Sequence, residues 1–594
     1  MSNRLFSKPQ VSAKNGRNSF DMSMRRLFTA PPGMLLPVYT DLANPGDHYK
    51  CDCSSFIRTE AVQTSAFTRF KAHFDWYAVP IRQLYAFWNE FYNGVNDVNT
   101  NFSVNSNYKL PTFDLGSAVK NIESFGIVES DDPTETDRYC SVDEFGVPYV
   151  HSFRRLADLL GFGNLTDWYN VNNKYNLHTP LLKFLAYHKI FYSRFYNNDF
   201  TKKDINLFNV DAYHGGIIPL ATASKIVSTM HYRPYRTNYF NNFLPYPTFS
   251  SEYANLVTNS FFPNVTRNQL NPEEVSANLV NAVGNNTGND QFPALSTVGL
   301  NNELAISAGD IRSLFAYDRL LRVTAIAGSS YEQQTLAHFG VKLPNGLTND
   351  AMYLGSQECD VNISEVVTTA TTDYKSGNPG TTIGDIAGKG FGASNGHGID
   401  FTANEHSIIM CIFSIEPICD FASTGMDRTN RYRDSLDFYH PELDDLGMQP
   451  FDNTELTTSY GFDQLNPYNS AVGWQYRFSE LKTKYDTVNE GFYDTFRKNW
   501  QTNYQNSIQE TGLSQFDANA RFYIHPQFAN TIFALQFPQF ERETATYNTK
   551  DGSGFANPFL QPQKIYGYDP FLIAADFQVY KSSIMSVHSL PRLS

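Results

Sequence analysis

Residues 408–415 constrain the fold more strongly than any other stretch. These eight consecutive residues are almost wholly apolar, and most of them are β-branched or aromatic. Eight residues match the length of a strand and fall far short of the roughly 20 needed to span a bilayer. A strand that is apolar on both faces is buried on both faces. Pro417 cannot donate to a ladder, so the sequence predicts a central buried strand that ends near this residue.

The segment before this strand, residues 388–398, holds five glycines and predicts a flexible loop that leads into the strand. Within it, residues 392–396 fit the pattern G-x-S-x-G. A nucleophile elbow requires a strand before the serine and a helix after it, whereas here we expect a loop before and a strand after. A formal match to the dinucleotide fingerprint at residues 388–393 likewise lacks the βαβ context. Neither pattern therefore predicts catalysis, and we expect no enzyme.

Further elements follow from hydrophobic spacing. Residues 70–78 alternate strictly and predict a half-buried antiparallel strand, and Pro80 is expected to begin an aromatic helix that Gly94 stops. The remaining expectations are a helix over 181–195 with Leu181, Phe184, Leu185, Phe191 and Phe195 inward, a strand over 224–232, a short helix over 330–340 and a closing strand within 568–580. Short strands with Pro- and Gly-rich turns favour an all-β core with helical and loop insertions.

Charge is distributed unevenly along the chain. The net charge is −14, but six cations against Asp21 give residues 1–26 a charge of +5 and leave −19 for the rest. Residues 1–30 are polar and lack periodicity, so we expect a flexible basic arm. A frayed terminus and a polyanion-binding tail are about equally compatible with this composition.

The six cysteines are too few for a disulfide scaffold in 594 residues. Cys51 and Cys53 lie near His48, which suggests a metal, but a second ligand pair at suitable spacing is lacking. We therefore expect reduced, inert cysteines and no metal or cofactor. Residues 1–16 lack the apolar segment of a signal peptide, and no stretch is long enough for membrane insertion. These features predict maturation in a reducing cytoplasm.

Residues 248–305 differ in character from the rest of the chain. Ten asparagines and few charges occur between residues 251 and 300. A long irregular insertion inside a compact fold is usually functional or disordered. Its amides offer paired donors and acceptors that suit sugars, so we expect this insertion to lie on the outer surface.

Motifs around the central strand resemble one known family. The strand begins Glu405-His406 and ends at Pro417, and is followed by Gly425-Met-Asp-Arg428 and by Asp437-Phe-Tyr-His-Pro-Glu-Leu-Asp-Asp-Leu-Gly-Met-Gln-Pro450. In combination these motifs resemble the major capsid protein of the Microviridae, and more closely its gokushovirus-like branch. The resemblance runs from Phe28 to the C-terminus, with gaps at about 95–150 and 248–305.

The resemblance implies a single eight-stranded antiparallel jelly roll with long helical and loop insertions, formed by residues 31–594. It further implies a homo-oligomer of sixty copies in a T=1 shell around a circular single-stranded DNA genome, assembled in the host bacterial cytoplasm and found in the virion. Expected partners are a small basic DNA-packaging protein, a pilot protein, a scaffolding protein and a host surface receptor. The alternative is a jelly-roll carbohydrate-binding or hydrolytic protein, which self-assembly would distinguish.

Two sets of residues are candidates for function. The basic arm is expected to face the particle interior and bind phosphates through Arg4, Lys8, Lys14, Arg17, Arg25 and Arg26. The resemblance implies that residues 248–305 are a variable surface insertion, which is expected to contribute to host attachment through Asn285, Asn286, Thr287, Asn289 and Asp290. An inter-subunit clasp is the alternative role for this insertion.

Overall fold

A computed structural model describes most of the β-rich part of the chain. The described residues are 16–62, 67–93, 109–115, 127–129, 138–140, 143–145, 147–163, 178–196, 208–244, 331–343, 349–367, 386–396, 398–422, 425–444, 447–455, 471–495, 522–526, 532–533, 543–545 and 569–587, with single residues and pairs between 312 and 327. Arg4, Lys8, Lys14 and the insertion 248–305 lie outside them.

The predicted central strand is confirmed as β13 (Ser407–Ile418), whose residues are buried as far as Pro417. It pairs antiparallel with β5 (Arg69–Pro80) on one side and with β3 (Leu36–Ala43) on the other. The continuous apolar run is thus explained, because β13 has strands on both edges and packed layers on both faces.

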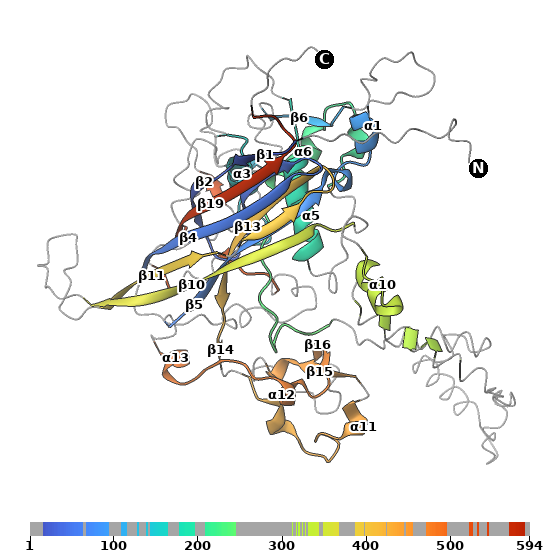
Figure 1. Cartoon of the computed structure of the whole chain (residues 1–594). Coiled ribbons are helices and arrows are strands. Elements are labelled where there is room, and N and C mark those ends of the chain that lie inside the picture. Colours follow the sequence, from blue (N-terminus) through green and yellow to red (C-terminus); the bar gives the residue numbers. More distant parts are fainter. Residues whose placement is uncertain are drawn as a thin grey trace, which may run out of the picture.

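β13 is one strand of a large antiparallel sheet of ten strands (Figure 1). Its path runs β1-β19-β4-β11-β10-β5-β13-β3, with β12 paired to β4 and β2 paired to β19. The strands not yet bounded are β1 (Asn18–Asp21), β2 (Met24–Ala30), β4 (His48–Val62), β10 (Met352–Val367), β11 (Ile386–Asn395), β12 (Ile399–Thr402) and β19 (Phe571–Ser583). The last of these is the predicted closing strand.

The sheet curls at β10, so that its two halves face each other. The first part of β10 pairs with β5, and its last six residues pair with β11. Aromatic rings from the two halves meet between them. Phe577 of β19 lies 5.8 Å from Trp76 of β5, and Phe571 lies 5.2 Å from Phe70. The main core therefore lies inside the curl, and the fold is mostly β as expected.

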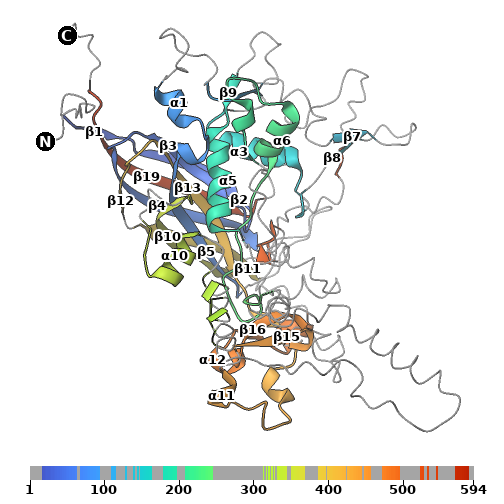
Figure 2. The same cartoon turned by 90° about the vertical axis from the view of Figure 1, so that its right-hand side faces the viewer.

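Helices cover the outer side of the half formed by β3, β13 and β5 (Figure 2). They are α3 (Tyr149–Leu159), α5 (Leu182–Arg194) and α6 (Leu220–Ser228). The five residues predicted to point inward from the helix at 181–195 are all buried. This layer also corrects the prediction of a half-buried strand at residues 70–78, because His73, Asp75 and Tyr77 on the outer face of β5 are buried too.

Two helix and strand assignments were wrong. Residues 220–228 form the helix α6 after Pro219, not the expected strand, since the helix packs against α3 and α5. The helix expected from Pro80 to Gly94 is divided into the 3₁₀ turn η2 (Ile81–Gln83) and the short helix α1 (Trp88–Asn93). Pro80 ends β5 and precedes the turn.

The glycine-rich segment is not a loop over residues 388–395, which belong to the strand β11. Gly390 of β11 lies against β4, where an added Cβ would meet Thr59 Cγ2 at 2.4 Å. An added Cβ at Gly392 would meet the Asp360 carbonyl oxygen at 2.9 Å. Glycine is therefore used here for the close approach of neighbouring groups.

A smaller lobe lies at one end of the molecule, away from α3, α5 and α6 (Figures 1 and 2). It contains η8 (Arg428–Arg431), α11 (Pro441–Asp444), β15 (Met448–Asp452), η9 (Asn453–Glu455), β16 (Ala471–Tyr476), α12 (Ser479–Lys482) and α13 (Gly491–Asp494). The remaining elements are β6 (Thr112–Asp114), β7 (Ile127–Glu129), β8 (Arg138–Cys140), β9 (His178–Pro180), η5 (Asp211–Tyr213), α10 (Tyr331–Phe339), β14 (Phe421–Ala422), β17 (Thr487–Val488) and β18 (Glu543–Ala545). Helix α10 confirms the prediction for residues 330–340.

The N-terminal region departs from the expected flexible arm. Residues 18–21 and 24–30 form β1 and β2, which pair with β19 at the end of the large sheet. The expectation of an irregular arm is therefore wrong for residues 18–30. Among the described residues, no helix is long and apolar enough to cross a membrane.

Candidate functional site

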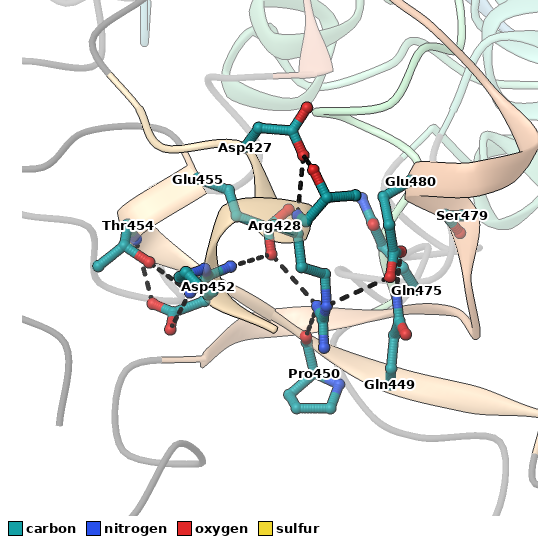
Figure 3. A network of polar contacts seen from close by, with 12 residues as sticks. Asp427, Arg428, Gln449, Pro450, Asp452, Thr454, Glu455, Gln475, Ser479 and Glu480 are labelled. Carbon is teal, nitrogen blue, oxygen red and sulfur yellow. Dashed lines mark hydrogen bonds and ion pairs between the residues drawn. The ribbon is translucent and has the colours of Figure 1, made fainter. Parts of the chain in front are cut away.

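The Gly425-Met-Asp-Arg428 motif begins a network of polar contacts in the smaller lobe (Figure 3). Asp427 precedes η8 and accepts hydrogen bonds from the Thr429 backbone N–H at 2.9 Å and from its hydroxyl at 2.8 Å. This cap fixes the start of the 3₁₀ turn. As a result the turn presents Arg428 and Arg431 to β15 and η9.

Both arginines bind carboxylates that are themselves buried. Arg428 donates to the Pro450 carbonyl at 2.8 Å and to Glu455 Oε1 at 3.2 Å. Arg431 donates to Asp452 at 3.0 Å and to the same Glu455 oxygen at 2.8 Å. Two guanidinium groups therefore share one carboxylate, which joins η8 to η9 and β15.

A second carboxylate continues the network to α12. Glu480 accepts from the Tyr432 hydroxyl at 2.6 Å and from Gln449 Nε2 at 2.7 Å. Gln449 in turn accepts from the backbone N–H of Phe478 at 3.0 Å. Phe478 has a φ of 58°, the left-handed region that a non-glycine residue rarely adopts. The network thus supports a strained backbone where β16 turns into α12.

Burial dominates the electrostatics of these groups. The pKa of Glu455 is raised by burial, although Arg428, the Tyr239 hydroxyl and Arg431 oppose this effect. Burial and the adjacent Glu455 carboxylate raise the pKa of Tyr239, whose hydroxyl donates to Glu455 at 2.5 Å. Tyr239 therefore stays protonated and joins the lobe to the segment before the insertion.

Hollows of about 120, 550 and 390 Å³ surround this network. Arg428, Arg431, Asp452 and Glu455, which line the first and third of these hollows, bind one another at the distances given above. Such an arrangement fixes the shape of the lobe.

The structure separates the predicted cations of the basic arm. Arg26 Nη1 donates to the Val38 carbonyl at 2.6 Å, so this side chain holds β2 against β3. Arg25 lies on the opposite face of β2, is 64% exposed and forms a 3.5 Å ion pair with Asp576. Arg17 is exposed just before β1. Arg4, Lys8 and Lys14 lie outside the described residues, as do the five residues predicted for host attachment.

The candidate metal ligands do not converge. Cys51 and Cys53 are buried in the core, and burial raises the pKa of each thiol to about 12. Zinc binds thiolates, which such thiols do not readily form. His48 contacts the Thr402 hydroxyl at 3.1 Å instead. Within the residues that the structure describes, no group of three or more His, Cys, Asp or Glu side chains could hold a metal.

Sequence reasoning missed several buried polar pairs. Arg155 binds both carboxylate oxygens of Asp569, at 2.9 and 3.0 Å, and both side chains are buried. His188 Nδ1 lies 2.7 Å from His231 Nε2, and both residues are buried among aromatic rings. These partners are separated by 414 and 43 residues. In the sequence, the one available signal was a polar residue at an inward-facing position of an apolar helix, Arg155 in α3 and His188 in α5.

The network holds the smaller lobe together, and comparison with known proteins identifies the family of the chain. The model of the capsid protein (F protein) family matches residues 9–128 and 158–544, well over half of the chain. The chain therefore belongs to this family, the capsid proteins of the Microviridae. It is therefore a virion component.

Individual capsid proteins agree with this assignment. The chain is 24% identical to capsid protein VP1 of Spiroplasma virus 4 over 34% of its length and to that of Chlamydia phage 1 over 32%. These two alignments span only about a third of each relative, 35% and 32%. Capsid protein VP1 of Bdellovibrio phage phiMH2K is 22% identical over 89% of both chains.

Proposed function

We propose that the chain assembles as sixty copies into a T=1 icosahedral shell that encloses a circular single-stranded DNA genome. The family match over most of the chain carries this proposal. The two facing halves of the antiparallel sheet support it, because they are the arrangement that an eight-stranded jelly roll would adopt. The long segments outside the sheet then supply contacts between subunits and the outer surface.

Mass photometry and negative-stain microscopy of material from infected cells test the assembly. The expected result is closed shells of megadalton mass. Monomers and dimers alone would overturn the proposal and favour the alternative, a jelly-roll carbohydrate-binding or hydrolytic protein.

The basic arm is proposed to meet the genome inside the shell, together with a small basic packaging protein. The proposal rests on a basic arm in a chain whose net charge is −14. Because Arg26 binds Val38 and Arg25 binds Asp576, the phosphate contacts are proposed for the four cations before β1, namely Arg4, Lys8, Lys14 and Arg17. Four such contacts give a salt slope of about −3 for single-stranded DNA.

A peptide of residues 1–17 titrated with single-stranded DNA at several salt concentrations measures this slope. A slope near zero would remove the DNA-binding role. Antibody access to the arm on intact particles would also do so, because the arm would then lie outside the shell.

The insertion 248–305 is proposed to lie on the outer surface and contribute to host attachment. Its asparagines, including Asn285, Asn286 and Asn289, offer amide groups suited to sugars, and its few charges do not suit DNA. Deleting residues 275–292 should leave shells intact and reduce adsorption to host cells. Failure of the deletion variant to form shells would instead favour an inter-subunit clasp.

A further inference from the structure

The outer face of the half-sheet formed by β2, β19, β4 and β11 carries large apolar side chains that are open to solvent. Phe391 is 52% exposed, Phe56 and Leu572 are each 37% exposed, and Leu27 is 70% exposed. The opposite face of the same strands is buried in the core. A soluble strand usually carries polar residues on its outer face, so this apolar cluster needs an explanation.

The strand register brings these side chains into two adjacent rows. Phe391 of β11 is opposite Arg58 of β4, which is opposite Leu572 of β19. In the next row, Phe56 of β4 lies between Ala393 and Ala574, and Ala574 is opposite Leu27. The rings of Phe56 and Phe391 meet edge to face, with their centres 5.3 Å apart.

Cations are placed among the rings. The Arg58 guanidinium lies over the ring of Phe56, 4.9 Å from its centre. Lys389, two residues before Phe391 on the same face, is exposed. Arg25 extends the face along β2, and its ion pair with Asp576 is exposed. Against these three cations stand Asp576 and the half-buried Glu60, so the face is locally positive on a chain whose net charge is −14.

We propose that this face is a binding platform for single-stranded nucleic acid. Aromatic side chains stack on bases of any sequence, and interleaved arginine and lysine side chains bind the phosphates. Phe56 and Phe391 supply the stacking surfaces, and Arg58 and Lys389 supply the cations. The described end of the basic arm, β1, pairs with residues 580–583 of β19, on the same half-sheet but towards the opposite end of that strand from Leu572.

This proposal rests on the proposed enclosure of a single-stranded DNA genome and adds where on the sheet the strand binds. The other occupant of an apolar face would be a second copy of the chain. The cations favour the nucleic acid, because a guanidinium stacked on an aromatic ring beside an exposed lysine offers both base stacking and phosphate contacts.

Anisotropy of a short fluorescein-labelled oligothymidylate, titrated with the unassembled full-length chain, tests the platform. Phe391→Leu and Phe56→Leu should each weaken binding on the order of 5- to 100-fold, since leucine fills space but cannot stack. Phe391→Trp should retain binding. Arg58→Gln and Lys389→Gln should each reduce the magnitude of the salt slope by about 0.7. Phe339→Leu, on the exposed α10, is the matched control and should leave affinity unchanged.

Circular dichroism and thermal unfolding establish that each variant is folded, and negative-stain microscopy records its shells. Unchanged affinity in the folded Phe391→Leu and Phe56→Leu variants would overturn the platform. Loss of shells with unchanged affinity would show that the face is a contact between copies, which also overturns it. If the wild-type chain binds the oligonucleotide but never forms shells, the assembly proposal fails while the platform stands.

Discussion

At the scale of single residues, the buried pair of Arg155 and Asp569 links helix α3 to the start of β19. Asp569 also accepts from the Thr29 hydroxyl of β2 at 2.5 Å. Arg155→Met should lower the free energy of unfolding by about 3–5 kcal/mol, because it leaves a buried carboxylate without its cation. Chemical denaturation of the unassembled chain measures the change.

The double variant Arg155→Met/Asp569→Leu distinguishes the loss of the ion pair from the cost of leaving the Asp569 carboxylate buried and unpaired. It should recover most of the lost stability, since replacing both partners removes the unpaired charge. Equal stability of the double variant and Arg155→Met would contradict this account of the pair.

The buried histidines His188 and His231 give stability a pH dependence. His188 Nε2 lies 2.6 Å from the Ile226 carbonyl and must donate to it, so its Nδ1 accepts from His231. Burial lowers the pKa of His188 to about 4, and burial and the neighbouring ring lower that of His231. Below about pH 6.5 the unfolded chain binds protons that the folded chain excludes, so stability falls as the pH falls towards 4.

For His188 alone this linkage amounts to about 2 kcal/mol between pH 7 and pH 5. Denaturant midpoints at the two pH values should therefore differ less in His188→Gln than in the wild type. His440→Gln, at an exposed position, is the control and should retain the wild-type difference. An identical pH dependence in His188→Gln would show that the pair does not titrate as described.

At the scale of elements, the sequence predicts well where one local signal dominates. The apolar run of β13 and the inward residues of α5 were correctly predicted for this reason. Errors arose where distant segments decide the outcome. Ile226 and Val227 favour a strand by propensity, but they belong to the helix α6, which packs against α3 and α5. The layer of helices also buries the polar face of β5, which was expected to be exposed. The network around Glu455 joins residues from 239 to 455, which no local pattern connects.

The glycines of β11 were predicted to form a loop, and substituting one of them tests the close packing that the structure shows instead. Gly390 donates its backbone N–H to the buried Thr59 hydroxyl at 2.6 Å, leaving no space for a methyl group. Gly390→Ala should destabilise the chain by about 1–3 kcal/mol through overpacking. In Gly216→Ala the added Cβ would meet its nearest neighbour at 3.6 Å, so that control should be nearly neutral. Thermal unfolding compares the melting temperatures of the two variants. Equal values would show that β11 tolerates a side chain at residue 390.

Differences in burial between elements predict different local stabilities. β13 is buried as far as Pro417, whereas no described residue of α10 is buried. Hydrogen exchange of the unassembled chain should therefore be slow in β13 and fast in α10. Comparable protection in both elements would contradict the isolation of α10 seen in the structure. Protection of α10 gained only in shells would place it at a contact between subunits.

At the scale of the whole molecule, the chain combines a curled antiparallel sheet with extensive segments outside it. The sheet supplies a rigid core, and the lobe at residues 425–495 is held together by buried ion pairs. The family could be recognised from the motifs around β13, because they occur together and in order. The apolar face that carries Phe56 and Phe391 could not, since it forms only when β4 and β11, far apart in the sequence, pair with each other.

The central claim is that sixty copies of this chain form a closed icosahedral shell around single-stranded DNA. Cryo-electron microscopy of particles purified from infected cells tests it most directly. The account predicts a T=1 reconstruction into which one copy of the curled sheet fits per asymmetric unit, with nucleic-acid density inside. Particles of another symmetry, or shells built from a different chain, would contradict it.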